Sequence, residues 1–349
     1  MTSPQTELRP GYSISRIIKG GWQLAGGHGA FDRRKAIADM LTFVDNGITT
    51  FDCADIYTGV EEMIGEAINA LRLRQAFDVD EHIQVHTKLV PDLERLSTVT
   101  HKELESIVDR SLKRLNLERL HLVQFYWWDL SLGDPLESLR VLKDLQRKGK
   151  IRYLGCTNWN QHDMQGFVDH EFDMVSAQVQ YSLLDQRPRG EFSQWCRTNR
   201  LKIFCYGVLA GGFLTVRWLG ESDPGFQFEN RSLIKYRLII EDFGGWDLFQ
   251  ELMQTLNIIG QEHSVPLSAV AARYMLNQSD VAAIIIGART AANISDTLAA
   301  VNFDLSDDNR RAIETVLASR TGPNGTVYEL ERDRTGPHGS IMKYNLNRT

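Results

Sequence analysis

Eight short apolar segments recur along this chain of 349 residues, and most of them are followed by a segment with the spacing of an amphipathic helix. The segments with the character of buried strands are 16–23, 49–55, 83–89, 120–127, 151–158, 174–182, 202–209 and 282–288. The helical segments are 33–46, 60–73, 102–115, 135–147, 161–169, 190–199, 246–275 and 291–301. Eight alternations of strand and helix predict an α/β protein with a closed parallel (β/α)8 barrel, the TIM barrel.

An open, doubly wound sheet is the alternative to the barrel. Such a sheet typically carries Gly-x-Gly-x-x-Gly after its first strand, and the glycine-rich segment 26–29 lacks that pattern. We therefore expect residues 1–318 to form a barrel with an N-terminal cap. The connection 215–245, after the seventh strand, is rich in glycine, proline, asparagine and aromatic residues, and its length predicts a functional lid loop. Residues 319–349 are interpreted as a C-terminal extended arm, which either covers the barrel mouth or reaches a neighbouring subunit of a homo-oligomer.

Charge and composition restrict the classes of partner. The net charge of −6 gives no electrostatic reason to expect nucleic acid or an anionic membrane surface. No run of eighteen apolar residues occurs, and the N-terminus lacks the basic and apolar regions of a secretory signal, so a cytoplasmic protein is predicted. The four cysteines form no Cys-x-x-Cys pair, which favours reduced core thiols and no metal site.

A carboxylate, a tyrosine and a lysine occur at the ends of two neighbouring predicted strands. Asp52 and Tyr57 end or follow the second strand, and Lys88 lies near the end of the third. In a parallel barrel these ends meet at the face where functional residues collect. We expect Asp52 to pair with Lys88 and the ammonium to lower the pKa of Tyr57 from its ordinary value of about 10. Such a group can give a proton to a carbonyl oxygen while hydride reaches the carbon. A buried salt bridge with a tyrosine packed beside it is the structural alternative.

The pattern Asp-x-Ala-x-x-Tyr at 52–57, followed by Thr-Lys at 87–88, resembles the aldo-keto reductases, and the resemblance extends over about residues 8–318. It implies an oxidoreductase that reduces aldehydes or ketones, with Asp52, Tyr57 and Lys88 as three members of the family's catalytic tetrad. Tyr57 would be the general acid.

The fourth tetrad member, a histidine, is missing. Tyr126 occupies its place in the segment 123–129, where it would shape the carbonyl pocket. A tyrosine hydroxyl can donate one hydrogen bond to a carbonyl, but the side chain is bulkier and reaches further. Loss of one well-aimed donor costs on the order of 10² to 10³ in rate if nothing replaces it.

The resemblance also implies a nicotinamide cofactor. Thr157, Asn158 and Gln178 resemble the clamp on the carboxamide, Tyr206 resembles the ring on which the nicotinamide stacks, and the segment 207–212 resembles a pyrophosphate loop. The full set assigned to the cofactor is Gly21, Trp22, Thr157, Asn158, Gln178, Tyr206, Gly207, Leu209, Gly211, Gly287, Arg289 and Asp296.

Arg289 decides the expected cofactor. A guanidinium offers bidentate donors to a 2′-phosphate, so NADP(H) is preferred, with NAD(H) as the alternative. Arg289 as a solvated surface residue is the competing interpretation. The strand-end tryptophans Trp22, Trp127 and Trp128 either form an aromatic wall for flat or apolar carbonyl substrates or pack the lid against the barrel. The basic residues of the lid, Lys235 among them, either hold an anion or face solvent.

Two other functions stay open at this point. The first is a nucleotide-binding regulatory or scaffold protein with slow or no turnover, because the family contains potassium-channel β subunits that also lack the tetrad histidine. The second is a barrel lyase or isomerase, against which the predicted cofactor residues argue. Retention of Asp52, Tyr57 and Lys88 favours a reductase that acts on a small-molecule carbonyl.

Overall fold

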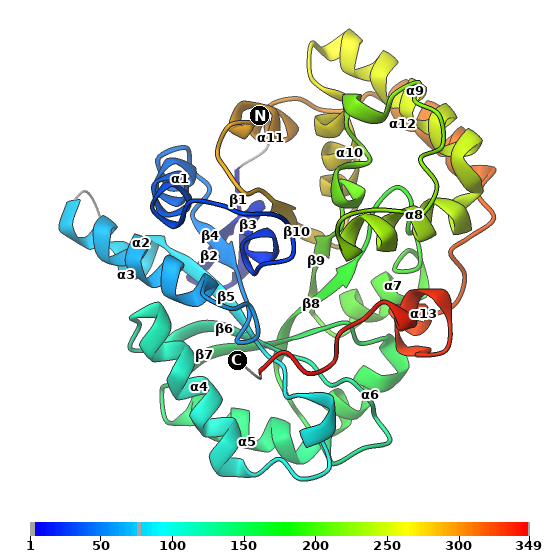
Figure 1. The fold of residues 1–349 in the computed structure, drawn as a ribbon. Coiled ribbons are helices and arrows are strands. Elements are labelled where there is room, and N and C mark those ends of the chain that lie inside the picture. Colours follow the sequence, from blue (N-terminus) through cyan, green and yellow to red (C-terminus); the bar gives the residue numbers. More distant parts are fainter. Residues whose placement is uncertain (1–3, 75–77, 348–349) are drawn as a thin grey trace.

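The computed structural model describes residues 4–74 and 78–347; residues 1–3, 75–77 and 348–349 lie outside the described part. Eight parallel strands close into a barrel in the order β10-β3-β4-β5-β6-β7-β8-β9, which confirms the predicted (β/α)8 fold and excludes the open sheet (Figure 1). The barrel strands are β3 (Ile17–Gly20), β4 (Thr50–Asp52), β5 (Gln84–Leu89), β6 (Leu120–Phe125), β7 (Ile151–Thr157), β8 (Met174–Gln180), β9 (Lys202–Tyr206) and β10 (Val281–Gly287).

Helices surround the barrel and follow its strands along the chain. They are α1 (Arg33–Asp45), α2 (Val60–Arg74), α3 (Val79–His82), α4 (His101–Leu115), α5 (Pro135–Arg147), α6 (Gln161–Asp169), α7 (Glu191–Thr198), α8 (Arg231–Phe243), α9 (Gly245–His263), α10 (Leu267–Leu276), α11 (Ile294–Asn302), α12 (Asp307–Ala318), α13 (Glu329–Arg332) and α14 (Pro337–Ser340). Short 3-10 turns are η1 (Trp22–Leu24), η2 (Leu93–Arg95), η3 (Ala210–Gly212) and η4 (Val216–Trp218).

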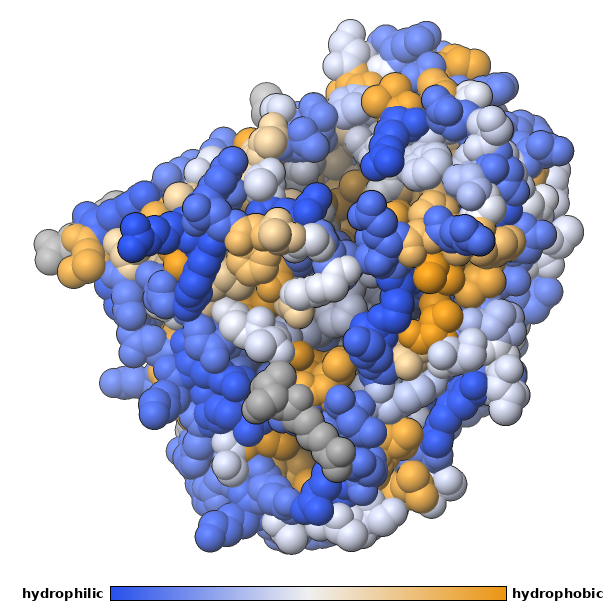
Figure 2. Space-filling model, viewed as in Figure 1, coloured by the Kyte–Doolittle hydropathy of each residue, from blue (hydrophilic) through white to orange (hydrophobic). Residues whose placement is uncertain are grey.

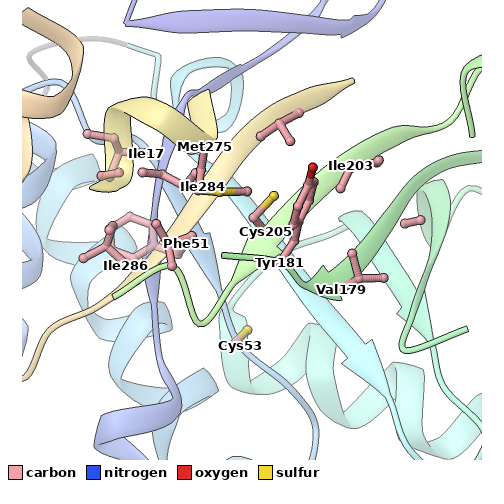
Figure 3. Close-up of a cluster of buried hydrophobic side chains, with 14 of the residues drawn as sticks. Ile17, Phe51, Cys53, Val179, Tyr181, Ile203, Cys205, Met275, Ile284 and Ile286 are labelled. Atoms are coloured by element: carbon pink, nitrogen blue, oxygen red, sulfur yellow. The ribbon is translucent and has the colours of Figure 1, made fainter. Parts of the chain in front are cut away.

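Successive side chains of each strand point to opposite faces, and this alternation separates two buried clusters. Ile17 and Ile284 belong to the cluster between strands and helices, part of which Figure 3 shows. Their neighbours Ile18 and Ile285 belong to a second, smaller cluster. The polar residues at the strand ends follow the same alternation. The side chain of Asp52 and polar side chains at the ends of other strands can therefore meet on the barrel axis.

An N-terminal hairpin, β1 (Gln5–Arg9) paired with β2 (Tyr12–Ser15), supplies apolar side chains to this second cluster. The Tyr12 hydroxyl lies 3.0 Å from Nε2 of His86, whose ring stacks on Phe204 at 5.3 Å. Burial lowers the pKa of His86 to about 3. His86 is therefore a neutral, hydrogen-bonded residue of the barrel interior.

The lid differs from the predicted loop. Residues 231–243 of the segment 215–245 form helix α8, which begins where the Asn230 side chain accepts a hydrogen bond from the Leu233 backbone N–H at 3.0 Å. The predicted helix 246–275 is also two helices, α9 and α10. They are separated at Ser264, which has a φ of 56°, and at Pro266, whose backbone cannot donate a hydrogen bond.

The segment after α12 crosses the mouth of its own barrel (Figure 1). It is not wholly extended, because it contains the short helices α13 and α14. His338 Nε2 lies 2.8 Å from Oδ2 of Asp242 on α8, and the Tyr344 carbonyl accepts a hydrogen bond from the Leu93 backbone N–H at 3.0 Å. The segment thus joins the lid helix to the loop after β5.

Within residues 4–74 and 78–347, no helix is long and apolar enough to cross a membrane, and no group of histidine, cysteine and acidic side chains is arranged to hold a metal ion. The four cysteines are buried free thiols.

Candidate active site

A cavity of 1150 Å³ opens at the carboxyl end of the barrel strands, with walls from the strand ends, the lid and the C-terminal segment. Figure 2 views this face, where hydrophobic side chains are visible around the hollow within a largely hydrophilic surface. The predicted site residues that line the cavity are Asp52, Tyr57, Lys88, Tyr126, Trp22, Thr157, Asn158, Gln178, Tyr206, Gly207, Leu209, Gly211, Gly287, Arg289 and Asp296.

Gly21 is the predicted site residue that does not line the cavity. Its backbone N–H donates to the Asp52 carbonyl at 2.8 Å. A Cβ atom on Gly21 would stand 2.7 Å from a methyl carbon of Val60 and 2.8 Å from the same carbonyl oxygen. Gly21 therefore allows the chain after β3 to approach β4 and α2 closely, and its assignment to cofactor binding stays a prediction.

Asp52 and Lys88 form a buried ion pair at the centre of the site. Lys88 Nζ lies 2.7 Å from both carboxylate oxygens of Asp52 and 2.8 Å from the Cys53 carbonyl. The carboxylate also accepts hydrogen bonds from the side chains of Gln178, at 2.7 Å, and Gln124, at 3.4 Å. Burial favours the neutral amine, but Asp52 and Tyr57 outweigh it and raise the pKa of Lys88. Lys88 is thus charged at neutral pH.

Tyr57 lies beside this pair, with the centre of its ring 5.1 Å from Lys88 Nζ and 5.1 Å from the ring of Trp22. Burial raises the pKa of Tyr57 to about 12, although Lys88 opposes that shift. The expected lowering of this pKa was wrong, because the charge of Lys88 is already balanced by Asp52 and the phenol is desolvated. Tyr57 is consequently protonated at neutral pH and available as a proton donor.

Tyr126 directly follows strand β6 and lines the cavity, although only 3% of its surface is exposed. Its ring stands edge-on to Trp128 at 4.7 Å and to Tyr328 of the C-terminal segment at 5.9 Å. Burial raises the pKa of Tyr126, so its hydroxyl stays protonated and can donate a hydrogen bond.

The residues predicted to hold the carboxamide are hydrogen-bonded to one another. The Thr157 hydroxyl donates to Oε1 of Gln178 at 3.2 Å, and the Gln178 amide donates to Asp52. The Tyr206 hydroxyl donates to Oδ1 of Asn158 at 2.8 Å. Two hydrogen-bonded pairs from the ends of β7, β8 and β9 therefore fix the orientation of these side chains, and one of the pairs is connected to the central carboxylate.

Helix α8 places one face against this part of the cavity. The Ser232 hydroxyl accepts a hydrogen bond from Trp22 Nε1 at 3.1 Å, and Lys235 Nζ lies 5.2 Å from the centre of the Tyr206 ring. Tyr236 packs on the loop after β9, because a Cβ atom on Gly207 would come within 2.6 Å of the Tyr236 hydroxyl. Sequence reasoning noted the charge of Lys235 but missed Tyr236, since the segment was predicted to be a loop without a face.

Arg289 lies on an outer part of the cavity and is exposed. Its Nη1 donates a hydrogen bond to the His28 carbonyl at 2.7 Å. Asp296, in the first turn of α11, is also exposed and lines the same cavity. Arg289 and Asp296 thus both lie at exposed positions of the cavity wall.

The tryptophans of the barrel mouth divide into two groups. Trp22 and Trp128 line the cavity, whereas Trp127 is buried and donates from Nε1 to the Leu132 carbonyl at 2.9 Å. Trp218 and Trp246 pack against each other at 6.0 Å. The aromatic wall therefore contains only part of the predicted set.

Comparison with known proteins gives a consistent result. The model of the aldo/keto reductase family matches residues 16–318. An NADH-specific methylglyoxal reductase of Escherichia coli is 25% identical over 316 residues, which cover 84% of this chain and 92% of that protein.

Solved structures share the fold. A glycerol dehydrogenase from Gluconobacter oxydans superposes with a TM-score of 0.75 at 24% identity, over 93% of this chain and 98% of that one. An aldo/keto reductase from Klebsiella pneumoniae, in complex with NADP and acetate, superposes with a TM-score of 0.66 at 21% identity, over 90% and 94% of the two chains.

The chain belongs to the aldo/keto reductase family, because the family model covers most of its length. It is accordingly an oxidoreductase of that type.

Proposed function

We propose that this protein reduces aldehydes or ketones to alcohols with NADP(H), and that Tyr57 is the general acid. The observation that carries the proposal is the buried contact of Lys88 with both Asp52 and Tyr57 at the floor of the cavity. The enzyme is favoured over a regulatory or scaffold protein because this proton-donating arrangement is complete except for the histidine position.

The cavity suits a dinucleotide in size and charge. Although the chain is acidic overall, basic side chains from several elements line the outer part of the cavity, and these are Lys35, Arg217, Arg231 and Arg289. Such groups match the phosphates of a dinucleotide. Asn158, Gln178 and Tyr206 would hold the nicotinamide, which supplies the hydride when the cofactor is bound. The Escherichia coli relative is specific for NADH and the Klebsiella pneumoniae structure is a complex with NADP, so the preference rests on Arg289.

The protein's own residues account for the proton transfer. A carbonyl oxygen that enters beside Tyr57 accepts a hydrogen bond from its hydroxyl, and the proton moves to that oxygen as hydride reaches the carbon. The ammonium of Lys88 stabilises the phenolate that remains, and Asp52 holds the ammonium in place. Tyr126 donates a second hydrogen bond that orients the carbonyl.

Substitution of Tyr57 by phenylalanine tests the general acid. We expect the Tyr57→Phe variant to lose reduction by about 10² to 10⁴-fold, the usual contribution of general acid catalysis. Single-turnover loss of NADPH absorbance with a panel of aldehydes and ketones measures the rate, and quenching of protein fluorescence measures NADPH affinity. A matched control is Tyr153→Phe, at a tyrosine of the second cluster that does not line the cavity. An unchanged rate in Tyr57→Phe would refute the assignment.

Substitution of Arg289 by alanine tests the cofactor preference. We expect NADPH affinity to fall about tenfold or more while NADH affinity changes little, because only NADPH offers the 2′-phosphate to a guanidinium. The control is Arg33→Ala, at a surface arginine that pairs with Glu66 at 2.6 Å. Equal losses for the two nucleotides would remove Arg289 from the phosphate site.

A further inference from the structure

Two neighbouring residues fix the C-terminal segment to different parts of the barrel mouth. Arg332 donates hydrogen bonds to the carbonyls of Trp127 and Trp128 at 3.0 and 2.9 Å, and to the Asn158 carbonyl at 3.0 Å. Its guanidinium therefore joins the segments that follow strands β6 and β7, and on the first of these it binds the two residues directly after Tyr126.

Glu331 makes the second attachment. Its two carboxylate oxygens each lie 3.0 Å from the Arg187 guanidinium, which also binds Asp185 at 2.7 Å. The three side chains are exposed by no more than 2%. Burial works against ionisation of Glu331, but Arg187 and Lys235 prevail and lower its pKa to about 2. The segment is thus held at neutral pH by charged groups that are shielded from water.

These attachments place Tyr328 in the active-site cavity. Tyr328 is 4% exposed, lines the cavity and stands edge-on to Tyr126 at 5.9 Å. Its backbone has a φ of 63°, which a tyrosine seldom adopts and which persists only where surrounding contacts impose it. Such conformations cluster at functional sites.

Tyr126 stands where the family's histidine is expected, and a phenol at that position needs a neighbouring group that fixes the direction of its proton. The hydrogen of a hydroxyl rotates about the C–O bond, so Tyr126 alone can aim its proton in several directions. The Tyr328 ring stands edge-on to the Tyr126 ring in the same cavity, and the Tyr328 hydroxyl opposes the burial that raises the pKa of Tyr126. A hydrogen bond donated by the Tyr328 hydroxyl would fill the acceptor position of the Tyr126 oxygen. The proton of Tyr126 would then be left to point into the cavity.

We propose that Tyr328 is a positioning residue of the active site, which aims the Tyr126 hydroxyl at the substrate carbonyl in place of the missing histidine. The inference rests on the proposed carbonyl reduction and extends it to the C-terminal segment. The substrate carbonyl would then meet two tyrosine hydroxyls, of which Tyr57 transfers a proton and Tyr126 donates a hydrogen bond, while Tyr328 orients Tyr126.

A double-mutant cycle tests the coupling between Tyr126 and Tyr328. Phenylalanine keeps each ring and removes only the hydroxyl, so we compare Tyr126→Phe, Tyr328→Phe and the double variant in the full chain. Single-turnover oxidation of NADPH gives the rate of reduction. We expect about 10² loss for Tyr126→Phe, as for removal of one donor to a carbonyl oxygen. We expect about tenfold loss for Tyr328→Phe, as for a residue that orients such a donor. The double variant should be no slower than Tyr126→Phe, because the two hydroxyls act as a unit.

A binding measurement separates this inference from the proposed function. Acetate binding to the NADP⁺-loaded protein, measured by calorimetry, needs no turnover, since a carboxylate oxygen stands in for the carbonyl oxygen. Tyr328→Phe should weaken acetate severalfold and leave NADP⁺ affinity unchanged. The matched control is Tyr344→Phe, at a tyrosine of the same segment whose hydroxyl donates to the Gly339 carbonyl at 2.6 Å.

Each outcome decides one of the two proposals. Weaker acetate binding in a protein that never oxidises NADPH would overturn carbonyl reduction and support the role of Tyr328. Normal turnover and acetate affinity in Tyr328→Phe would overturn the role of Tyr328 alone. Losses that multiply in the double variant would also overturn it, because they would show that the two hydroxyls act independently.

Discussion

The two ends of this barrel are occupied by segments from opposite ends of the chain, and they are closed in different ways. The N-terminal hairpin contributes apolar side chains and the contact between Tyr12 and His86. The C-terminal segment crosses the other end through ion pairs and hydrogen bonds, such as those of Glu331 and Arg332, and a cavity of 1150 Å³ remains beneath it.

The difference shows what each kind of closure permits. Apolar packing fills space and leaves no room for a ligand, because buried side chains interdigitate closely. Charged attachments at separate points hold a segment across an opening without filling it. They require ionised groups in a buried position, and the stability of that end then depends on every charge being paired.

The largest expected effect tests the charged closure. Arg187→Leu should lower the free energy of unfolding by about 3 to 5 kcal/mol, because the buried Asp185 carboxylate would lose its ion pair and Glu331 would keep only Lys235, at 3.8 Å. Urea unfolding measures the change. The control is Arg197→Leu, which removes a pair with Asp280 at 2.7 Å whose arginine is 63% exposed. Similar stabilities for the two variants would show that the Glu331 attachment does not stabilise the mouth.

An effect that is smaller for each residue tests the apolar end through pH. Burial lowers the pKa of His86 to about 3 and that of His121 to about 4, whereas both titrate near 6.5 in the unfolded chain. Their neutral forms stabilise the fold above pH 6.5, and this contribution is lost as the pH falls from 6.5 toward 4. For each histidine, the free energy of unfolding should fall by about 1.4 kcal/mol for every unit by which the pH is lowered between 6.5 and 4.

Urea unfolding at pH 7, 6 and 5 measures this slope. The His86→Gln variant keeps a side chain that can bond to Tyr12 and removes one titrating group. Its stability should therefore fall less steeply with acid than that of the natural chain. Parallel slopes would mean that His86 is protonated in the folded protein.

The smallest expected effect is at the hairpin itself. Tyr12→Phe keeps the ring and removes the hydroxyl, so the hairpin should lose about 1 kcal/mol, the usual net contribution of one hydrogen bond. The matched variant at the mouth is Tyr328→Phe, which should change stability little and activity more. A loss of activity in Tyr12→Phe would contradict the view that only one end of the barrel is functional.

The fold and most of the candidate site could be predicted because they follow from local pattern. Strand length, apolar runs and helical spacing repeat eight times, and parallel strands bring their carboxyl ends together wherever the chain closes. Asp52, Tyr57 and Lys88 needed no further information to be placed in one cavity. The role of Gly21 could not be predicted in this way, because a glycine at a strand end can serve close packing as well as ligand binding.

The sequence by itself determined the barrel and the residues at its strand ends, since both depend on neighbours along the chain. Only the tertiary structure decided that burial raises the pKa of Tyr57 although Lys88 lies beside it, because desolvation depends on everything packed around a group. The same holds for Tyr328, which is 202 positions from Tyr126 and reaches it through a segment without periodic pattern. Contacts of that kind are set by where charges such as Glu331 and Arg187 find each other in the folded chain.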